Sequence, residues 1–297
     1  MQNMGERPEN SAPVGGQEIQ QPIAERRRPH VLPLTFLFLL VLTALITAGV
    51  WYNKYDPPID RTAPGEWMAD LRTEQIAQLV APEGHPRWLD FPGVVNARDL
   101  GGYPTYDGKT TRWGVLFRSG RLRDLDEHGC EVFRSLNIQT VIDLRNRLIV
   151  DSTLHDGDPA CVQAAADMEL FRFIPPREEG DTPAEAMRAL VRRNTNTIRN
   201  VLETLAEPNR YPLLYHCTQG RDRAGIISFL LLDMLGVDRR VIRAEYDLSG
   251  DVGKSSDYEN INAIFADIDA AGGIHQYLRD MGVSYKVQRR VRENLLE

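Results

Sequence analysis

From about residue 68 onward, short apolar runs alternate with longer stretches in which apolar residues recur every three or four positions. The short runs are partly β-branched, as buried strands are, and the longer stretches have the period of helices. The predicted strands are residues 93–97, 114–119, 138–144, 170–174 and 212–216, and the predicted helices are residues 124–136, 183–206, 223–235, 239–247, 258–270 and 284–296. This alternation predicts one α/β domain, residues 68–297, with a mostly parallel central sheet flanked by helices.

The chain before that domain has a different pattern. Residues 1–30 are polar and rich in Gly, Pro, Gln and Glu, which predicts a disordered tail. Residues 31–50 contain no charged side chain, and a helix of that length, at ~1.5 Å per residue, matches the ~30 Å hydrocarbon core of a bilayer. We therefore expect a transmembrane anchor at 31–52 and a Pro-containing linker at 53–67. The alternative is a cleaved signal peptide, whose apolar region is normally shorter, ~7–15 residues.

Three adjacent arginines at residues 26–28 precede the apolar segment. Basic residues are enriched on the cytoplasmic side of membrane helices. We therefore expect a cytoplasmic N-terminus and an extracytoplasmic α/β domain, although Lys54 and Arg61 reduce the asymmetry.

Composition narrows the classes of partner. The net charge is -7 and the isoelectric point is about 5.5, so no overall positive field attracts nucleic acid. The three cysteines, Cys130, Cys161 and Cys217, are widely spaced and form no CxxC pair. Such spacing argues against a disulfide framework and against a structural zinc site. We expect at least one free thiol, and neither a metal nor a cofactor.

One cysteine stands in an unusual context, the sequence LLYHCTQGRDRAG at residues 213–225. An apolar strand ends at His216 and a helix is predicted to begin near Asp222. Cys217 therefore lies at the carboxyl end of a strand and faces a helix N-terminus, which is where ligands bind in α/β folds.

The loop after this strand has the composition of an oxyanion site. Gly220 and Gly225 allow backbone N–H groups to approach a ligand closely, and the helix dipole adds positive potential. Arg223, six residues after the cysteine, offers a planar guanidinium for two phosphate oxygens. Such a field favours a thiolate, so Cys217 is a candidate nucleophile. The alternatives are a buried core cysteine and a His–Cys metal pair, which is disfavoured because adjacent strand residues point in opposite directions.

The segment HCTQGRDRAG resembles the HCxxGxxRxG signature of cysteine-dependent protein tyrosine phosphatases. Three upstream segments resemble the bacterial branch of that superfamily, which includes tyrosine and phosphoinositide phosphatases: NARDLGGYPT at 96–105, WGVLFRSGRL at 113–122 and TVIDLRN at 140–146. The resemblance extends from about residue 90 to 250 and implies a tyrosine phosphatase-like fold. The apolar segment lies outside it.

The resemblance implies a role for each residue of the signature. Cys217 would attack phosphorus and form a cysteinyl-phosphate that water hydrolyses. Arg223 and the backbone N–H groups of residues 218–223 would bind the phosphoryl oxygens, and His216 would orient the loop and sustain the thiolate. Asp222 is the candidate general acid, and it also suits a helix N-cap. The phosphate-binding loop would comprise His216, Thr218, Gln219, Gly220, Arg221, Ala224 and Gly225.

Residues of the upstream segments would support the site or bind substrate. Asp99 is the reserve candidate for the general acid. Asp143 and Arg145 are expected to form an internal ion pair under the site. Arg118, together with Arg121 and Arg123, could supply cations for a lipid headgroup, although arginines on loops are more often simply solvated.

Two positions depart from the family pattern. The usual lysine of the signature is Arg221, which changes the donor geometry and weakens an inference of lipid preference. The usual Thr or Ser is Ala224, so a hydroxyl that would stabilise the departing thiolate is missing. The expected substrate is phosphotyrosine, with phosphoserine and phosphothreonine as further substrates. Alternatives are a phosphoinositide or inositol phosphate phosphatase, and a membrane-anchored pseudophosphatase that binds a phosphorylated partner.

Overall fold

The computed structural model describes residues 38–39, 41–43, 86–145, 159–174, 182–249 and 258–297. The chain divides into two compact units, Met1–Pro58 and Ile59–Glu297. In the first unit the described residues are short helical pieces. The predicted tail, the linker and the rest of the predicted anchor lie outside the described residues. Within the described part, no helix is both long enough and apolar enough to span a bilayer.

The second unit is built on a five-stranded sheet with the strand order β1-β2-β5-β3-β4. The strands are β1 (Arg98–Asp99), β2 (Leu116–Ser119), β3 (Thr140–Asp143), β4 (Asp167–Leu170) and β5 (Leu213–His216). The last four pair in parallel, and β1 pairs antiparallel with β2. The sheet is therefore mostly parallel, as predicted. The strand that leads into the signature loop, β5, lies at its centre, where both faces are covered and an apolar run is required.

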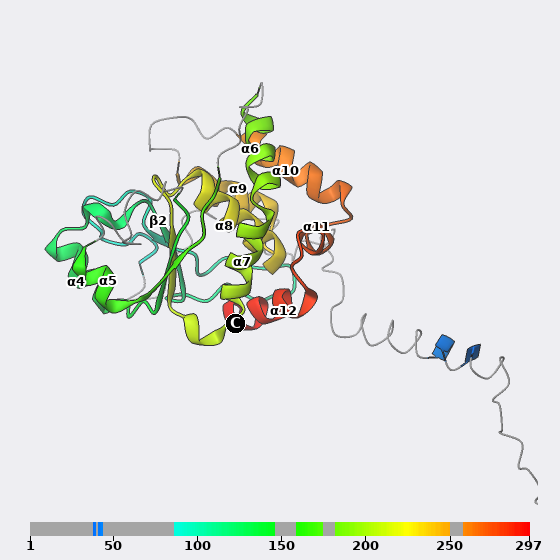
Figure 1. Ribbon diagram of the computed structural model, residues 1–297, viewed down its shortest axis with the longest axis horizontal. Helices are drawn as coiled ribbons and strands as arrows, with labels where there is room; N and C mark the ends of the chain where they lie inside the picture. Colours follow the sequence, from blue (N-terminus) through cyan, green and yellow to red (C-terminus); the bar gives the residue numbers. More distant parts are fainter. Residues whose placement is uncertain (1–37, 40, 44–85, 146–158, 175–181, 250–257) are drawn as a thin grey trace, which may run out of the picture. The chain divides into compact units, whose positions relative to one another are not determined.

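Helices cover both faces of the sheet (Figure 1). One face packs against α4 (Glu127–Ser135) and α5 (Ala160–Ala165), and η1 (Leu122–Asp124) lies in the same part of the chain. The helices of the larger core, around the other face, are α6 (Pro183–Arg193), α7 (Thr195–Leu205), α8 (Asp222–Leu235), α9 (Arg239–Asp247), α10 (Tyr258–Ala270), α11 (Ile274–Asp280) and α12 (Tyr285–Leu295), with η2 (Pro208–Arg210) between α7 and β5.

Helix α8 forms the centre of the larger core. Every residue from Ala224 to Leu235 is buried, which explains why its sequence is apolar on all sides. It ends at Gly236 in the left-handed conformation, with φ of 87°, as expected for a glycine that terminates a helix. The loop between β5 and α8 is therefore anchored at both ends in the most buried elements of the domain.

The predicted helix at 183–206 is two helices, because Asn194 interrupts it. The side chain of Asn194 accepts a 2.6 Å hydrogen bond from the Ile174 N–H and donates to the carbonyl oxygens of Ile174 at 2.9 Å and Leu190 at 2.7 Å. A buried amide that bonds to neighbouring backbone competes with helical hydrogen bonding. The prediction of one continuous helix is therefore wrong.

Two predicted strands are displaced. Residues 93–97 form turns, in part because Asn96 adopts φ of 58°, and the paired residues of β1 come directly after them. The strand predicted at 170–174 lies at Asp167–Leu170, where it is the edge strand beside β3. An edge strand does not require the continuous apolar run that the prediction relied on. The short helices α5 and α11 were not predicted.

The cysteine prediction requires one correction. Cys130 of α4 and Cys161 of α5 form a disulfide, with their Cα atoms 5.7 Å apart, and Cys217 is free. The spacing of 31 residues in the sequence hid the pairing, because the fold brings the two helices together on one face of the sheet. The argument against a disulfide was therefore wrong.

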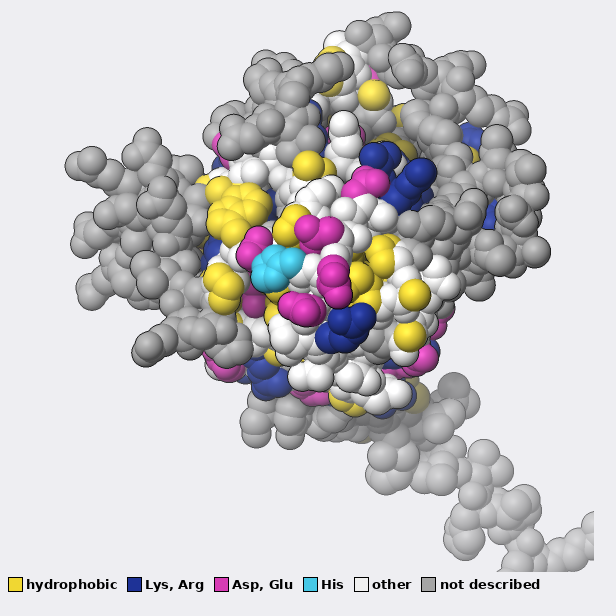
Figure 2. Space-filling model, turned by 90° about the vertical axis from the view of Figure 1, so that its left-hand side faces the viewer, with side chains coloured by type: hydrophobic (Ala, Val, Ile, Leu, Met, Phe, Trp, Pro, Cys, Tyr) yellow, Lys and Arg dark blue, Asp and Glu magenta, His cyan; other side chains and the backbone are white. Residues whose placement is uncertain are grey.

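The face that carries α4 and α5 is acidic. Figure 2 shows carboxylates gathered around one histidine on this side of the domain. His128 of α4 lies 2.9 Å from Asp90, and this hydrogen bond raises the pKa of the imidazole. The disulfide-bearing face therefore does not attract polyanions.

Candidate active site

The signature loop begins at the carboxyl end of β5, between two other strand ends. The parallel register places His216 level with Ser119 of β2 and with Asp143 of β3. Cys217 follows directly and its residue is 2% exposed. Thr218 and Gln219 are exposed, and the chain returns to the interior at Gly220. The thiol thus lies at the base of a loop whose middle faces solvent.

Gly220 is required by the way the loop packs against β2. Its φ is 67°, and a Cβ at this position would lie 2.6 Å from the Gly120 nitrogen and 2.7 Å from the Ser119 carbonyl oxygen. Any other residue would therefore displace backbone from backbone. The glycine allows the loop to sit directly on the end of the neighbouring strand.

Consecutive carbonyl groups of the loop are held by partners outside it. The Thr218 oxygen accepts from the Arg121 N–H at 3.1 Å. The Gln219 oxygen accepts from the Asn96 side-chain amide at 2.8 Å. The Gly220 oxygen accepts from the buried Arg118 guanidinium, which also donates to the Arg221 oxygen at 3.3 Å.

These bonds orient the N–H groups of the loop. In a trans peptide, a carbonyl and the N–H of the next residue point in opposite directions. The N–H groups of residues 219–222 therefore point away from the partners that hold the preceding carbonyls. A row of consecutive N–H groups with one orientation is an anion-binding arrangement, and here it lies next to Cys217 and the N-terminus of α8.

The side chain of Arg223, in the first turn of α8, extends back toward the start of the signature loop. Its Nη2 donates to the Thr218 hydroxyl at 2.9 Å, and its Nη1 lies 3.5 Å from the Leu144 oxygen. Both contacts place the guanidinium over the start of the loop, one residue from Cys217. The structure therefore brings together the two residues that the signature identified as nucleophile and phosphate ligand.

His216, Asp143 and Arg145 form a group beneath the thiol. The Nε2 of His216 lies 4.0 Å from an Asp143 oxygen, and Arg145 forms the expected ion pair with Asp143 at 2.7 Å. Burial alone would raise the pKa of the Asp143 carboxyl, but the hydrogen bonds from Arg145 and the charge of His216 lower it below its ordinary value. Asp143 is therefore an ionised carboxylate at the end of β3, and the side chain of Arg145 is occupied by its ion pair with this carboxylate.

Asp222 is exposed at the start of α8, whereas the side chain of the neighbouring Arg221 is largely buried, at 12% exposed. The Asp222 side chain is 56% exposed at the first position of α8, 3.8 Å from the Arg221 Nε. Ala224 is fully buried behind the loop. A Cβ on Gly225 would lie 2.7 Å from the Tyr246 ring, so this glycine allows close packing of α9. An exposed carboxyl at the rim is in reach of a ligand bound above the loop.

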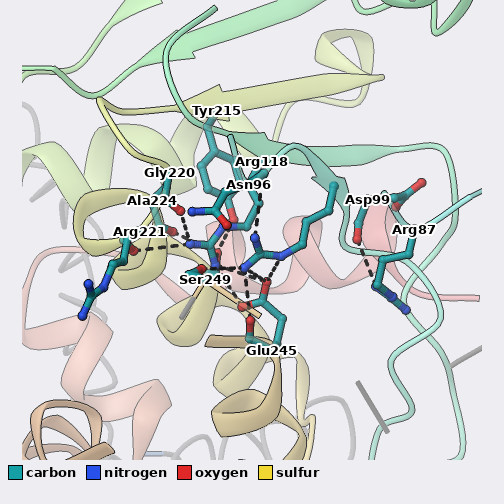
Figure 3. Close-up of polar contacts among 12 residues, drawn as sticks. Arg87, Asn96, Asp99, Arg118, Tyr215, Gly220, Arg221, Ala224, Glu245 and Ser249 are labelled. Carbon is teal, nitrogen blue, oxygen red and sulfur yellow. Dashed lines mark hydrogen bonds and ion pairs between the residues drawn. The ribbon is translucent and has the colours of Figure 1, made fainter. Parts of the chain in front are cut away.

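Asp99, the reserve candidate for the acid, has a different environment. Its two carboxylate oxygens accept from the Gly101 and Gly114 N–H groups, each at 2.7 Å. Figure 3 shows it separated from Gly220 and Ala224 by the Arg118–Glu245 cluster. The residue holds two turns of the upstream segments together, which is a structural task.

Arg118 is not on the surface, so the expectation that it supplies a cation to a lipid headgroup is wrong. Its side chain has no exposed area and pairs with Glu245 at 2.9 Å. The sequence placed it beside Arg121 and Arg123, which are exposed, but it lies within β2 and points into the domain. Arg121 forms a 2.7 Å ion pair with Asp124.

Sequence reasoning missed two residues that organise the site, Asn96 and Glu245. The sequence of α9 contains a signal that could have identified Glu245. Glu245 lies four residues after Val241 and three after Ile242, on the buried face. A carboxylate on an apolar face indicates a buried cationic partner. For metals, the described residues contain no group of three or more His, Cys, Asp or Glu side chains that could hold an ion.

The comparison with known families agrees with this geometry. Residues 89–297 match the Tyrosine phosphatase family, and the chain belongs to it. The match includes the upstream segments, the signature loop and the C-terminal helices, and it begins after the apolar segment.

Individual relatives are more distant. The chain is 30% identical over 176 residues to a protein of Cupriavidus necator that carries a tyrosine-protein phosphatase name, covering 53% of this chain and 61% of that protein. It is 29% identical over 195 residues to the triple specificity protein phosphatase PtpB of Mycobacterium tuberculosis, covering 54% and 69%.

Two solved structures also match. The PP-IP phosphatase SIW14 core from S. cerevisiae has 13% identity and a TM-score of 0.35, covering 50% of this chain and 78% of its own. TpbA of P. aeruginosa has 16% identity and a TM-score of 0.32, covering 59% and 90%.

Proposed function

We propose that this protein is a phosphomonoester hydrolase that acts through a cysteinyl-phosphate, with phosphotyrosine as its main substrate. One observation carries the proposal: the carbonyls of residues 218–220 each accept a hydrogen bond from a residue of the upstream segments, so that the N–H groups that follow them turn away from those partners, directly after Cys217 in the loop. A phosphoryl group with three oxygens matches such a row of donors together with one guanidinium.

The steps follow from this arrangement. The Cys217 sulfur forms a bond to phosphorus while the bond from phosphorus to the ester oxygen breaks. The proton that the departing oxygen needs comes from Asp222 at the rim. Water then attacks phosphorus and gives its proton to the Asp222 carboxylate, while the bond from phosphorus to sulfur breaks and the sulfur leaves as a thiolate. Arg223 and the loop N–H groups stabilise the phosphoryl oxygens in both steps.

The depth of the thiol supports an aryl ester as the preferred substrate. Cys217 is 2% exposed at the base of the loop, so the phosphorus must be carried down to it. The ring of phosphotyrosine extends further from the peptide backbone than the short side chain of phosphoserine. We expect the same site to accept phosphoserine and phosphothreonine more slowly, and a relative is named a triple specificity protein phosphatase.

The alternatives receive less support from the described residues. Arg118, Arg121 and Arg123 were the cations that could bind a lipid headgroup. Arg118 is buried and Arg121 pairs with Asp124, which leaves Arg123 as the exposed one of the three without a close ion pair among the described contacts. The missing hydroxyl at Ala224 favours a pseudophosphatase, whereas the presence of a candidate nucleophile, phosphate ligand and acid in the sequence, Cys217, Arg223 and Asp222, supports catalysis. We therefore retain hydrolysis of phosphorylated protein as the proposal.

We also propose that the domain lies outside the cytoplasm, held by the apolar segment at 31–52. The Cys130–Cys161 disulfide supports this location, because disulfides persist mainly in oxidising compartments. The arginines at 26–28 support the same orientation. A reporter that is active only outside the cytoplasm, fused after Glu297, should be active. Activity of a cytoplasmic reporter instead would reverse the topology.

The central test is turnover of an aryl phosphate by the full-length chain and by its Cys217→Ser variant. We expect the wild type to release the phenol and the variant to be inactive. Phosphopeptides and phosphoinositides assayed side by side then rank the substrates. Equal rates for wild type and variant would refute the proposed function. Faster hydrolysis of phosphoinositides than of phosphopeptides would show that the substrate is a lipid.

A further inference from the structure

Three charged side chains are buried together next to the signature loop, and Figure 3 shows two of them, Arg118 and Glu245, beside Gly220. We call Arg98, Arg118 and Glu245 the buried triad. Arg98 pairs with Glu245 at 2.8 Å, and Arg118 pairs with the other carboxylate oxygen at 2.9 Å. Each of the three side chains is at most 1% exposed. They come from β1, β2 and α9, so the triad joins three elements that are distant in the sequence.

The carboxylate of the triad is stabilised in its charged form. Burial alone would raise the pKa of Glu245, but the charges of Arg118 and Arg98 lower it below its ordinary value. Buried charges are costly unless hydrogen bonds satisfy them. Arg98 also donates to the Ser249 hydroxyl at 3.0 Å, and Arg118 donates to the Ser228 hydroxyl at 2.7 Å. The carboxylate thus has two cationic partners, each with further acceptors.

Arg118 differs from Arg98 because its remaining donor faces the loop. Its Nη2 donates to the Gly220 carbonyl and lies 3.3 Å from the Arg221 carbonyl oxygen. Its other terminal nitrogen is held by Glu245 and Ser228. A guanidinium fork is rigid, so fixing one nitrogen fixes the other.

We propose that Arg118 is a positioning residue for the oxyanion site, and that Glu245 holds Arg118 in place. Arg118 keeps the Gly220 carbonyl turned inward, so that the N–H group of Arg221 faces the phosphoryl group. The Arg221 carbonyl, 3.3 Å from Arg118, accepts a closer hydrogen bond from the Gly225 N–H of α8, at 2.7 Å. A charged donor on a carbonyl also polarises the peptide and strengthens its N–H as a donor. This inference rests on the proposed function, in which that face of the loop binds phosphate.

The domain contains a matched control, Arg87. Arg87 is also buried, and it also donates to two carbonyl oxygens, those of Asp99 at 3.0 Å and Gly101 at 2.9 Å. Its guanidinium stacks on the rings of Tyr103 and Trp113, at 4.4 and 4.5 Å from their centroids. These contacts are with the upstream segments rather than the signature loop, so a substitution there reports the cost of losing a buried arginine alone.

The experiment measures binding of inorganic phosphate to the full-length chain by calorimetry, in a Cys217→Ser background that removes chemistry. We expect Arg118→Met to weaken phosphate binding more than tenfold and Arg118→Lys, which keeps the charge but not the fork, about tenfold. Arg87→Lys should leave phosphate affinity unchanged. Thermal unfolding of each variant shows that it is folded at the temperature of the measurement.

The inference can be tested even if one variant does not fold. If Arg118→Met does not fold, Arg118→Lys and Ser228→Ala still test the inference, and the second should weaken phosphate binding a few-fold because it removes one anchor of the guanidinium. Unchanged affinity in folded Arg118→Lys, or an equal loss in Arg87→Lys, would overturn the positioning role. Because binding is measured without turnover, absence of hydrolysis in wild type would refute the proposed function separately.

Discussion

Asn96 and Gln219 are 123 positions apart in the sequence, yet the side-chain amide of Asn96 donates a 2.8 Å hydrogen bond to the Gln219 carbonyl. Asn96 adopts φ of 58°, a left-handed conformation that asparagine tolerates better than most residues. The bond joins the upstream segment to the signature loop and fixes one of its peptides. It explains in physical terms why the two segments belong to one site.

The first prediction tests that bond. Asn96→Ala should lower kcat/KM for an aryl phosphate about tenfold, because one loop peptide loses its anchor and the left-handed backbone becomes less favourable. Asn137→Ala is the matched control, since Asn137 also has positive φ, 50°, but is exposed in the turn that follows α4. Both variants should lose stability. Similar kcat/KM values for the two would show that Asn96 acts only on folding.

The second prediction concerns the acid. Asp222→Asn should slow hydrolysis of alkyl phosphates by about 10²-fold or more and spare esters of acidic phenols, because only a poor leaving group needs a proton. The control is Glu127→Gln, which removes a carboxylate from the first turn of α4 and has the same effect on a helix dipole. Steady-state rates over a series of leaving groups provide the measurement. Equal losses on all esters would remove Asp222 from this role.

The third prediction concerns Ala224, which stands where the family usually has a hydroxyl. Without that donor, hydrolysis of the cysteinyl-phosphate should limit turnover, so rapid mixing with an aryl phosphate should show a burst of phenol close to one per site. Ala224→Thr should raise the steady-state rate up to about tenfold, the worth of a hydrogen bond to a charged group. Ala224 is fully buried, so unfolding must be checked in parallel. Absence of a burst would show that another group already stabilises the thiolate.

The fourth prediction concerns acid stability. The pKa of Asp143 is lowered in the folded protein, so this carboxylate contributes stability that is present above its unfolded pKa, about 3.9. That contribution is lost as the pH falls through the folded value. The difference in unfolding free energy between wild type and Asp143→Asn should therefore be about 1–3 kcal/mol near neutral pH and should shrink below about pH 4. Denaturant titrations from pH 2 to 7 provide the measurement, and a constant difference would contradict the assignment.

The fifth prediction concerns the disulfide. Replacing both Cys130 and Cys161 by serine should lower the free energy of unfolding by about 3–4 kcal/mol, because the crosslink closes a loop of 31 residues. The kinetic constants for an aryl phosphate should not change, since the bridge joins α4 to α5 and not the signature loop. A reducing agent should destabilise the wild type and leave the double variant unaffected. Equal stability of wild type and double variant would show that the bridge contributes little.

Local pattern determined the class of fold. The apolar runs around Val141 and Leu214 and the largely apolar helix after Gly225 predicted a mostly parallel sheet flanked by helices, because burial on both faces of the sheet requires apolar residues throughout a strand. The helix predicted at 223–235 ends where the structure ends α8, at Gly236, whose left-handed backbone conformation suits glycine. The identity of the candidate nucleophile also followed from local sequence, since strand, cysteine, glycines and arginine lie within a few residues of one another.

Long-range contacts decided the rest. The pairing of Cys130 with Cys161, the bond from Asn96 to the loop and the burial of Arg118 all depend on which strands become neighbours. Sheet pairing is set by the packing of whole elements, so no local pattern reports it. Arg118 shows the difference most directly: beside Arg121 and Arg123 in the sequence it has the pattern of a solvated cation. The sequence by itself therefore determined the chemistry of the loop, whereas only the tertiary structure decided which buried charges hold that loop in its conformation.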